Sequence, residues 1–358
     1  MERRLVSVEA QRKQRAGGEV RETLVTGATG FIGHHLVGAL CARGDTVRAL
    51  VLPTEDTAWL EQHHVTVYRG DVCQREELIE PMQGVDTVFH LAAIHGLWRP
   101  RQDYYSVNVT GVENVCRAAL AAGVKRLIHV SSWAVYGMGL GQPVREDFPL
   151  RPGSDLYAAT KADADKLVQS YITRDYLPGV IIRPGTVFGP GDWINFGRMA
   201  DRLRAGRAII IGSGRNAVPF VYVSDIVDGL LLAASREQAV GRVFNLTNDQ
   251  PLTQAQLWHA IALEIGAKPP RLHIPYFALY ALAFAAERAV KQVHPQRQPL
   301  VTRLGVKLFG SDNRHEIDKA RRELGYAPRI SLREGVHITA RWYLQHRNGS
   351  QVASAAVA

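Results

Sequence analysis

The stretch Thr26-Gly27-Ala28-Thr29-Gly30-Phe31-Ile32-Gly33 follows a short apolar run at 23–26 and precedes an apolar helical pattern at 31–43. Glycines between a strand and a helix let the backbone approach a pyrophosphate, and the helix N-terminus favours negative charge there. A tight turn alone would also need glycine, so the flanking strand and helix carry the interpretation. The stretch therefore predicts a dinucleotide-binding turn built on Gly27, Gly30 and Gly33.

Apolar runs alternate with helical patterns over the first half of the chain. We expect strands at 23–26, 46–52, 65–68, 85–91, 126–130 and 180–183, and helical segments at 31–43, 74–83, 106–122 and 154–173. Strands that alternate with helices form a parallel sheet covered on both faces, with right-handed crossovers. The predicted fold class is therefore α/β, a Rossmann doubly wound parallel sheet.

The pattern changes after residue 187. Turns rich in glycine and proline precede helix-like stretches near 196–205, 253–266 and 276–291, which predict a smaller, mostly helical C-terminal substrate lobe. We assign 21–187 to an NAD(P)-binding Rossmann domain with a returning strand near 220–247, and 188–345 to the lobe. Residues 1–20 are expected to be a disordered basic extension, and 346–358 a disordered tail.

The composition is that of a globular protein with a basic excess. The 358 residues are 46% hydrophobic and 22% charged, and part of the formal charge of +9 lies in 1–20. Since no nucleic-acid-binding motif accompanies this charge, we expect no nucleic-acid partner. The charge would suit an anionic cofactor or an anionic membrane surface. Three cysteines give no even disulfide framework, which favours a cytoplasmic location.

No apolar run reaches the roughly 18 residues that span a bilayer. The nearest is 276–286, eleven residues without a charge. This run predicts either a buried helix of the lobe or an apolar lid or membrane-touching helix that serves an apolar substrate. Peripheral membrane contact therefore stays open beside the cytoplasmic assignment.

Tyr157 and Lys161 stand four residues apart in a helical pattern, so both lie on one helix face. Tyr157 is the predicted general acid/base, which gives or takes the proton on the substrate oxygen as a hydride moves at its carbon. Lys161 would lower the pKa of the phenol and bind the nicotinamide ribose. Ser132 would hold the oxygen beside the tyrosine. Alternatively, Ser131 and Ser132 cap a loop while Tyr157 packs and Lys161 is solvated.

Several other polar residues bear on the site. Asp71, after the third strand, would accept a hydrogen bond from the adenine amine, cap a helix, or both. Asn108 would hold an active-site loop or make a structural hydrogen bond. At the end of the second strand an acid would bind the ribose 2′-hydroxyl, whereas arginine would favour a 2′-phosphate. Residues 48–54 contain no acid, and Arg48 and Arg69 are near, so within NAD(P)(H) we favour NADP(H). The thirteen histidines show no metal-ligand spacing, so no metal is expected.

Together these motifs resemble the extended short-chain dehydrogenase/reductase family, the NAD-dependent epimerase/dehydratase superfamily, over about 22–345. Residues 26–33 are similar to its cofactor fingerprint, 131–137 to its serine segment, 157–161 to its Tyr-x-x-x-Lys, and 183–191 to its loop beside the nicotinamide. The resemblance also implies a homodimer through the helices near 106–122 and 154–173. It implies cofactor contacts by Gly27, Thr29, Gly30, Phe31, Ile32, Gly33, Asp71, Val72, Ala92, Lys161 and Pro184.

Within the family, Val218 bears on the substrate. Sugar-nucleotide epimerases carry an arginine at this position, and it binds the substrate's diphosphate. The segment 216–225 looks more like that of 3β-hydroxysteroid dehydrogenases and sterol-4-carboxylate decarboxylating dehydrogenases. The later stretches 299–303 and 320–328 are also similar to those enzymes, and equally to the reductases of 2-alkyl-3-oxoalkanoates. Trp133 and Ala134 follow Ser132, where dehydratases have an acidic pair.

The resemblance therefore implies an NAD(P)-dependent oxidoreductase that interconverts a secondary alcohol and a ketone on a hydrophobic small molecule. That molecule would be a 3β-hydroxysteroid or sterol, or a long-chain 3-oxo or 3-hydroxy acid. His95, Trp98 and Trp193 fall in loops that would border it, or they are ordinary loop packing. A nucleotide-sugar epimerase is the alternative enzyme, and a non-catalytic NAD(P)-binding regulator is the alternative of another class.

Overall fold

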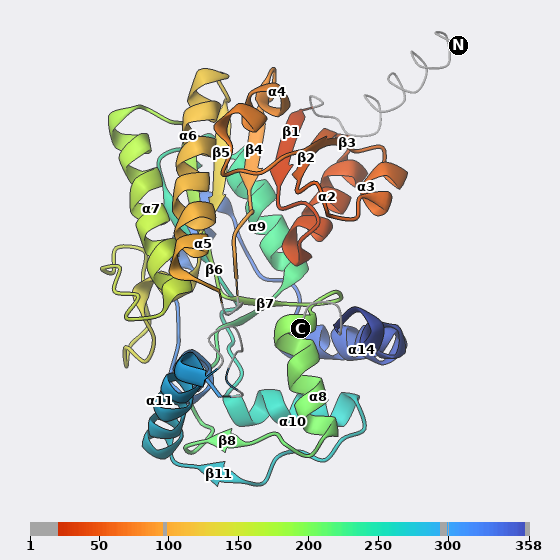
Figure 1. Ribbon diagram of the computed structural model, residues 1–358, viewed down its shortest axis with the longest axis vertical. Coiled ribbons are helices and arrows are strands. Elements are labelled where there is room, and N and C mark those ends of the chain that lie inside the picture. The colour runs from red at the N-terminus through yellow and green to blue at the C-terminus, as the bar shows by residue number, and fades with distance from the viewer. Residues whose placement is uncertain (1–20, 96–98, 294–298, 300, 355–358) are drawn as a thin grey trace.

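The computed structural model describes residues 21–95, 99–293, 299 and 301–354. A parallel sheet with the strand order β10-β6-β5-β4-β1-β2-β3 lies at its centre (Figure 1). The chain builds the sheet outward from β1 to β3 and then starts again on the other side of β1 with β4, which confirms the doubly wound Rossmann fold. The strands are β1 (Glu22–Thr26), β2 (Thr46–Val51), β3 (Thr66–Arg69), β4 (Thr87–His90), β5 (Arg126–Val130), β6 (Gly179–Pro184) and β10 (Val243–Leu246).

Helices cover both faces of this sheet because successive strand residues point to opposite faces. Leu24 and Leu127 pack with α6 (Val112–Ala121) and α7 (Leu156–Arg174) on one face. Val25 and Ile128 pack with α2 (Phe31–Arg43) and α9 (Val223–Ser235) on the other. The helical segments of the first half are α2 (Phe31–Arg43), α3 (Ala58–Gln62), η1 (Arg75–Leu78), α4 (Ile79–Met82), α5 (Arg101–Tyr105), η2 (Ser106–Gly111), α6 (Val112–Ala121), η3 (Trp133–Tyr136) and α7 (Leu156–Arg174). With both faces covered, the carboxyl ends of the strands remain as the edge on which a site can form.

The second half of the chain forms a lobe beyond this edge, below the sheet in Figure 1. It also returns to the sheet as predicted, because Val243 of β10 pairs with Ile181 of β6. Two small parallel sheets complete the fold: β7 pairs with β9, and β8 pairs with β11 at the far end of the lobe (Figure 1). The elements are β7 (Thr186–Phe188), η4 (Trp193–Gly197), α8 (Arg198–Arg204), β8 (Ile210–Ile211), β9 (Phe220–Tyr222), α9 (Val223–Ser235), η5 (Glu237–Ala239), α10 (Gln254–Glu264), β11 (His273–Ile274), α11 (Tyr276–Val293), α12 (Arg303–Gly310), α13 (Asp318–Leu324) and α14 (Leu332–Ser354).

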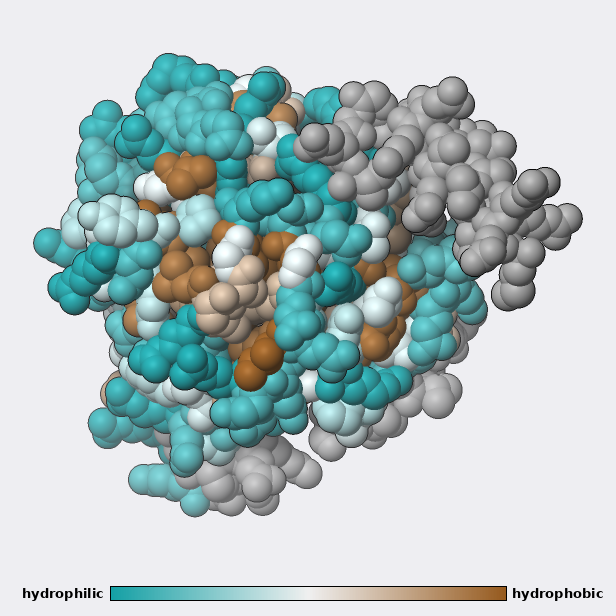
Figure 2. Space-filling view, turned by 90° about the horizontal axis from the view of Figure 1, so that it is seen from above, coloured by the Kyte–Doolittle hydropathy of each residue, from teal (hydrophilic) through white to brown (hydrophobic). Residues whose placement is uncertain are grey.

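Figure 2 shows the end where the strands of the main sheet begin: hydrophilic residues cover most of it, and hydrophobic residues gather in groups near its centre. A mixed surface of this kind is ordinary for a globular protein. At the other end, α11 forms the outer edge of the lobe (Figure 1). Within the described ranges, no helix is both long and apolar enough to span a bilayer.

The carboxyl-terminal helix α14 continues to Ser354, although the sequence predicts a disordered tail from residue 346. Trp342 packs on Trp193, and Tyr343 is buried and hydrogen-bonded to Asp201. Once these turns are anchored, each further residue adds a helical hydrogen bond without a new nucleation step. The helix therefore includes residues 346–354 of the predicted tail; residues 355–358 and the basic extension 1–20 lie outside the described part.

Candidate active site

The glycine turn lies between β1 and α2, at the edge where the strands end. Gly27 has a φ of +72°, and a Cβ atom there would come within 2.8 Å of the backbone nitrogen of Ala92. A Cβ atom on Gly33 would lie 2.1 Å from the carbonyl oxygen of Gly27, so helix and strand approach this closely only without side chains. Gly30 is the N-cap of α2, and no described side chain caps this end. The backbone N–H groups of the first turn are therefore left for an anionic ligand.

A cavity of about 860 Å³ opens beside this turn. Its lining combines the glycine turn, the ends of several strands and an apolar wall, which suits a nucleotide together with an apolar substrate. Of the residues that the sequence assigns to the site, only Trp98 lies outside the described part of the chain. The others all line the cavity: Gly27, Thr29, Gly30, Phe31, Ile32, Gly33, Asp71, Val72, Ala92, His95, Ser132, Tyr157, Lys161, Pro184 and Trp193.

Ser132 and Tyr157 come from two neighbouring elements, each fixed by a cap. Ser132 follows β5 and caps η3, where its Oγ accepts a hydrogen bond of 3.2 Å from the Ala134 N–H. Asp155 caps α7 and accepts a hydrogen bond of 2.9 Å from the Ala158 N–H. Helix α7 therefore begins immediately before Tyr157, and the first turn brings the phenol into hydrogen-bonding reach of Ser132.

Burial dominates the protonation of Tyr157 and Lys161. It raises the pKa of Tyr157 to about 12, while the hydrogen bond with Ser132 acts in the opposite direction. Burial also lowers the pKa of Lys161 to about 8, against the charge of Asp165. The Lys161 Nζ donates a hydrogen bond of 2.7 Å to the carbonyl oxygen of Val130, at the end of β5. The sequence predicts a lowered pKa for the phenol; in the structure desolvation disfavours the phenolate, so Tyr157 keeps its proton at neutral pH.

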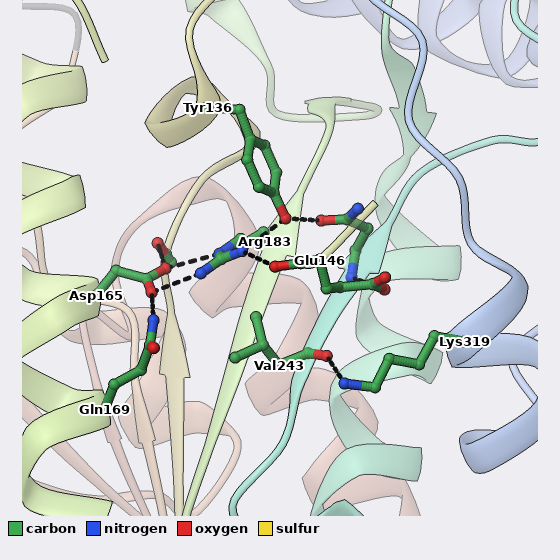
Figure 3. A network of polar contacts seen from close by, with 9 residues as sticks. Tyr136, Glu146, Asp165, Gln169, Arg183, Val243 and Lys319 are labelled. Carbon is green, nitrogen blue, oxygen red and sulfur yellow. Dashed lines mark hydrogen bonds and ion pairs between the residues drawn. The ribbon is translucent and has the colours of Figure 1, made fainter. Parts of the chain in front are cut away.

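Ser131, next to Ser132 in the chain, belongs to a buried polar network around Asp165 and Arg183 (Figure 3). Asp165 of α7 and Arg183 of β6 form an ion pair of 2.8 Å, and their side chains are 0% and 2% exposed. The Asp165 carboxylate also accepts hydrogen bonds of 2.7 Å each from the Ser131 Oγ and the Gln169 Nε2, and Arg183 donates to the Tyr136 hydroxyl at 2.7 Å. Because the Ser131 hydroxyl points into this network, Ser132 is the serine that faces Tyr157. The network joins β6, α7 and the serine segment.

Two further polar residues hold the loops around the cavity. The Asn108 Oδ1 accepts a hydrogen bond of 2.8 Å from the Ile94 N–H, and its Nδ2 donates to the Ile94 carbonyl oxygen and to Thr160 of α7, both at 3.1 Å. The loop after β4 is thus tied to the helix that carries Tyr157, and these hydrogen bonds are compatible with both predicted roles of Asn108. Asp71 accepts a hydrogen bond of 2.9 Å from the Cys73 N–H within the loop and also lines the cavity. The N-cap of η1 is Gln74, so the predicted helix-capping role of Asp71 is wrong and its place beside the cavity remains.

Aromatic side chains border the cavity near the phenol. The His95 ring meets the Tyr157 ring edge to face, with their centroids 5.0 Å apart. Trp193 lines the cavity and packs on Trp342 of α14 at 4.6 Å. The two interpretations of Trp193, as a substrate contact and as loop packing, are therefore compatible.

The segment after β2 differs from the sequence interpretation. Glu55 lines the cavity, and its Oε2 accepts a hydrogen bond of 2.9 Å from the Leu52 N–H. Arg69 instead stabilises this loop, because it donates a hydrogen bond of 3.0 Å to the carbonyl oxygen of Pro53. Arg48 is paired with Glu22, at the start of β1 and away from the glycine turn. An acid is therefore available at the cavity, but it lies one turn beyond the strand, outside the window 48–54.

Sequence reasoning missed the apolar wall of the cavity. Leu304 and Leu308 of α12 line it, together with Met138. The two leucines are one helical turn apart and so share a face. That spacing in the sequence predicts a shared apolar helix face. It does not show that this helix, more than 250 residues after the glycine turn, lines the same cavity. Arg99 also lines the cavity and was not predicted.

Val218 is fully buried and lies among the core residues of the lobe. It precedes β9, and its N–H donates to the carbonyl oxygen of Leu252. Asn216, two residues before, donates to the carbonyl oxygens of Phe309 and Ser311 on either side of the end of α12. The segment that would carry a diphosphate-binding arginine in an epimerase here supports α12 instead.

Comparison with known proteins agrees with this geometry. Residues 23–247 match the model of the NAD dependent epimerase/dehydratase family. A ketoreductase of 4-hydroxy-2-methyl-3-oxo-4-farnesyl-3,4-dihydroquinoline-1-oxide from Stigmatella aurantiaca is 34% identical, over 88% of this chain and 94% of its own. The decarboxylating sterol-4-alpha-carboxylate 3-dehydrogenase of Mus musculus is 32% identical, over 90% of each chain.

A solved structure has the same fold. The crystal structure of gox2253 superposes with a TM-score of 0.78 at 31% sequence identity, over 91% of this chain and 98% of that one. The family match covers the glycine turn, the Tyr157/Lys161 helix and the returning strand β10. The chain therefore belongs to the NAD dependent epimerase/dehydratase family, the extended short-chain dehydrogenases/reductases, and is an NAD-dependent enzyme that acts on a CH–OH group.

Proposed function

We propose that the protein interconverts a ketone and a secondary alcohol on a large apolar substrate, a sterol or steroid or a long-chain 3-oxo acid. One observation carries the proposal: Tyr157 and the glycine turn share a cavity whose remaining wall includes Leu304 and Leu308. A phosphorylated sugar would gain little from that wall, whereas a ring system or an alkyl chain would bury apolar area on it.

In the proposed reaction, a bound nicotinamide supplies or accepts the hydride. Tyr157 donates its proton to the carbonyl oxygen during reduction and takes it back during oxidation. Ser132 holds the same oxygen, so the charge that develops there is stabilised. The Lys161 ammonium lies one helical turn away, at the end of β5, and favours negative charge at the site. Because the pKa of Tyr157 is raised, the phenol carries its proton at neutral pH. This supports ketone reduction, the direction in which Tyr157 donates that proton.

The two relatives are consistent with an apolar substrate, because one is named for a farnesyl-bearing quinoline oxide and the other for a sterol carboxylate. The first name describes the reduction of a ketone, and the second describes a dehydrogenation at position 3 of a sterol. The burial of Val218 weighs against the nucleotide-sugar alternative, because a valine inside the core offers no charge to a diphosphate. An epimerase is therefore the second outcome of the test below.

The decisive experiment follows nicotinamide absorbance with 3β-hydroxysteroids, long-chain 3-oxo acids and UDP-sugars, each with NAD(H) and with NADP(H). We expect turnover on a steroid or a 3-oxo acid and none on UDP-sugars. Epimerised UDP-sugar without a net absorbance change would contradict the proposal in favour of an epimerase. Cofactor binding without turnover on any class would favour a non-catalytic regulator.

For the cofactor, Glu55 supports NAD(H), although the sequence favours NADP(H). A carboxylate at this edge accepts hydrogen bonds from the ribose 2′-hydroxyl and repels a 2′-phosphate. We expect the wild-type protein to prefer NAD(H). Glu55→Gln should shift the ratio of kcat/KM for NADH over NADPH toward NADPH by about tenfold, since one charge contact is worth roughly 1–2 kcal/mol.

The matched control is Glu76→Gln, which removes an exposed carboxylate on η1. It should leave the cofactor ratio unchanged. A wild-type preference for NADPH, or an equal shift in both variants, would contradict the role given to Glu55.

Two assignments stay predictions, the homodimer and the cytoplasmic location. Helices α6 and α7 lie side by side at the outer edge of the molecule (Figure 1), where the homodimer expected from the family would form. The cytoplasmic location is likewise an expectation from the cysteine content. Sedimentation velocity at two protein concentrations tests the first of these.

A further inference from the structure

Helix α11 is held to the lobe by one face only. Leu279 and Ala283 are 3% and 0% exposed and pack with Ile211 and Val306. The opposite side of the helix, named here the outward face of α11, consists of exposed apolar residues with no charge among them: Phe277, Ala278, Ala281, Leu282, Phe284 and Ala285. A helix on a protein surface ordinarily turns polar residues outward. Here Phe277 is 77% exposed, Leu282 60% and Phe284 41%, so the outward face has no covering in the described chain.

Cations flank this face. Between residues 265 and 310 the sequence has a single carboxylate, Glu287, against seven lysines and arginines. Glu287 is 8% exposed and forms an ion pair of 2.7 Å with Arg303. Its negative charge is therefore neutralised inside the protein and does not offset the surface cations. Arg288 lies over the Phe284 ring at 4.9 Å, at the border of the apolar face. Lys268 and Arg271 are exposed just before β11, near the other end of the helix.

We infer that the outward face of α11 docks the protein on an anionic lipid surface. An amphipathic helix of this kind buries its apolar side at the boundary of headgroups and acyl chains, while flanking lysines and arginines meet anionic headgroups. A second copy of the chain fits this face less well. A two-fold contact places like against like, so the cations of one copy would oppose the cations of the other.

The position of α12 connects the docking face with the cavity. Val306 of α12 packs in the cluster that contains Leu279 of α11, whereas Leu304 and Leu308 line the cavity. Helix α12 therefore packs against the lipid-facing helix through Val306 and lines the cavity through Leu304 and Leu308. An apolar substrate would then leave the lipid close to the helix that forms part of the cavity wall. This step of the inference rests on the proposed function; lipid docking itself does not.

The test is co-sedimentation of the full chain with vesicles of phosphatidylcholine, with and without phosphatidylglycerol. We expect binding to the anionic vesicles that weakens as salt is added. The double variant Phe277→Asp/Leu282→Asp should lower the vesicle partition coefficient at least about tenfold, because two apolar side chains no longer insert. Ile79→Asp is the matched control: Ile79 is 56% exposed on α4, at the opposite end of the molecule, and its variant should bind like the wild type.

The outcomes separate docking from catalysis. Wild-type protein that ignores anionic vesicles, or a double variant that binds as the wild type does, would overturn the inference. Concentration-dependent self-association that the double variant abolishes, without vesicle binding, would assign the face to a second copy instead. Turnover of a short water-soluble ketone should be equal in wild type and double variant. Loss of all turnover would count against the proposed function alone, because the vesicle assay needs no catalysis.

Discussion

Tyr157→Phe is expected to lower kcat for ketone reduction by about 10³-fold, within the range of 10²–10⁴ that a positioned general acid contributes. The substitution removes only the hydroxyl that Ser132 contacts and leaves the ring that packs beside His95. The KM for the cofactor should change little, because the glycine turn and the Lys161 contact with Val130 stay intact. Steady-state kinetics with the substrate found in the panel, together with titration of NADH binding, measures both quantities.

Tyr171→Phe is the matched control. Tyr171 lies on the same helix, and its hydroxyl accepts a hydrogen bond of 3.0 Å from Arg117 on the outer side. Loss of that hydroxyl should leave kcat within a factor of about two, as for most surface substitutions. If Tyr157→Phe kept near wild-type turnover, Tyr157 would not be the proton donor, and His95 would become the next residue to test.

The local motifs are sufficient to predict the fold and to select residues that the structure brings together in one cavity. The turn at Gly27 and Gly33 is readable from sequence because only glycine permits the close approach of α2 to β1 and β4. Tyr157 and Lys161 are readable because four residues along a helix define one face. These signals act over a few residues, so no knowledge of tertiary contacts is needed to interpret them.

The parts that were missed depend on distant segments. Glu55 lies in a loop whose course is set by Arg69, sixteen residues from the Pro53 carbonyl that it holds. Leu304 and Leu308 reach the cavity only because α12 packs beside it. The direction of the Tyr157 pKa shift also depends on the whole fold, because desolvation comes from every atom that excludes water around the phenol.

The buried pair of Asp165 and Arg183 gives the largest expected effect on stability. Asp165→Ala would leave the Arg183 charge buried without its partner and would remove the acceptor of Ser131 and Gln169. Breaking a buried pair in this way costs about 3–5 kcal/mol of the free energy of unfolding. Urea denaturation followed by tryptophan fluorescence measures this loss. Activity should fall as well, because the network fixes the serine segment against α7.

Two further variants make the argument specific to the buried charge. Asp163→Ala, on the same helix, removes a carboxylate that accepts, within the described residues, one hydrogen bond of 3.2 Å from the Tyr105 hydroxyl, and it should cost only about 1 kcal/mol. The double variant Asp165→Leu/Arg183→Met removes both charges and should be more stable than Asp165→Ala, since no unpaired charge remains buried. If Asp165→Ala cost no more than Asp163→Ala, or if the double variant were the least stable of the three, the penalty would lie in packing or in the neutral hydrogen bonds. In that case the ion pair would not be the interaction that fixes the position of α7, which carries Tyr157, relative to β6.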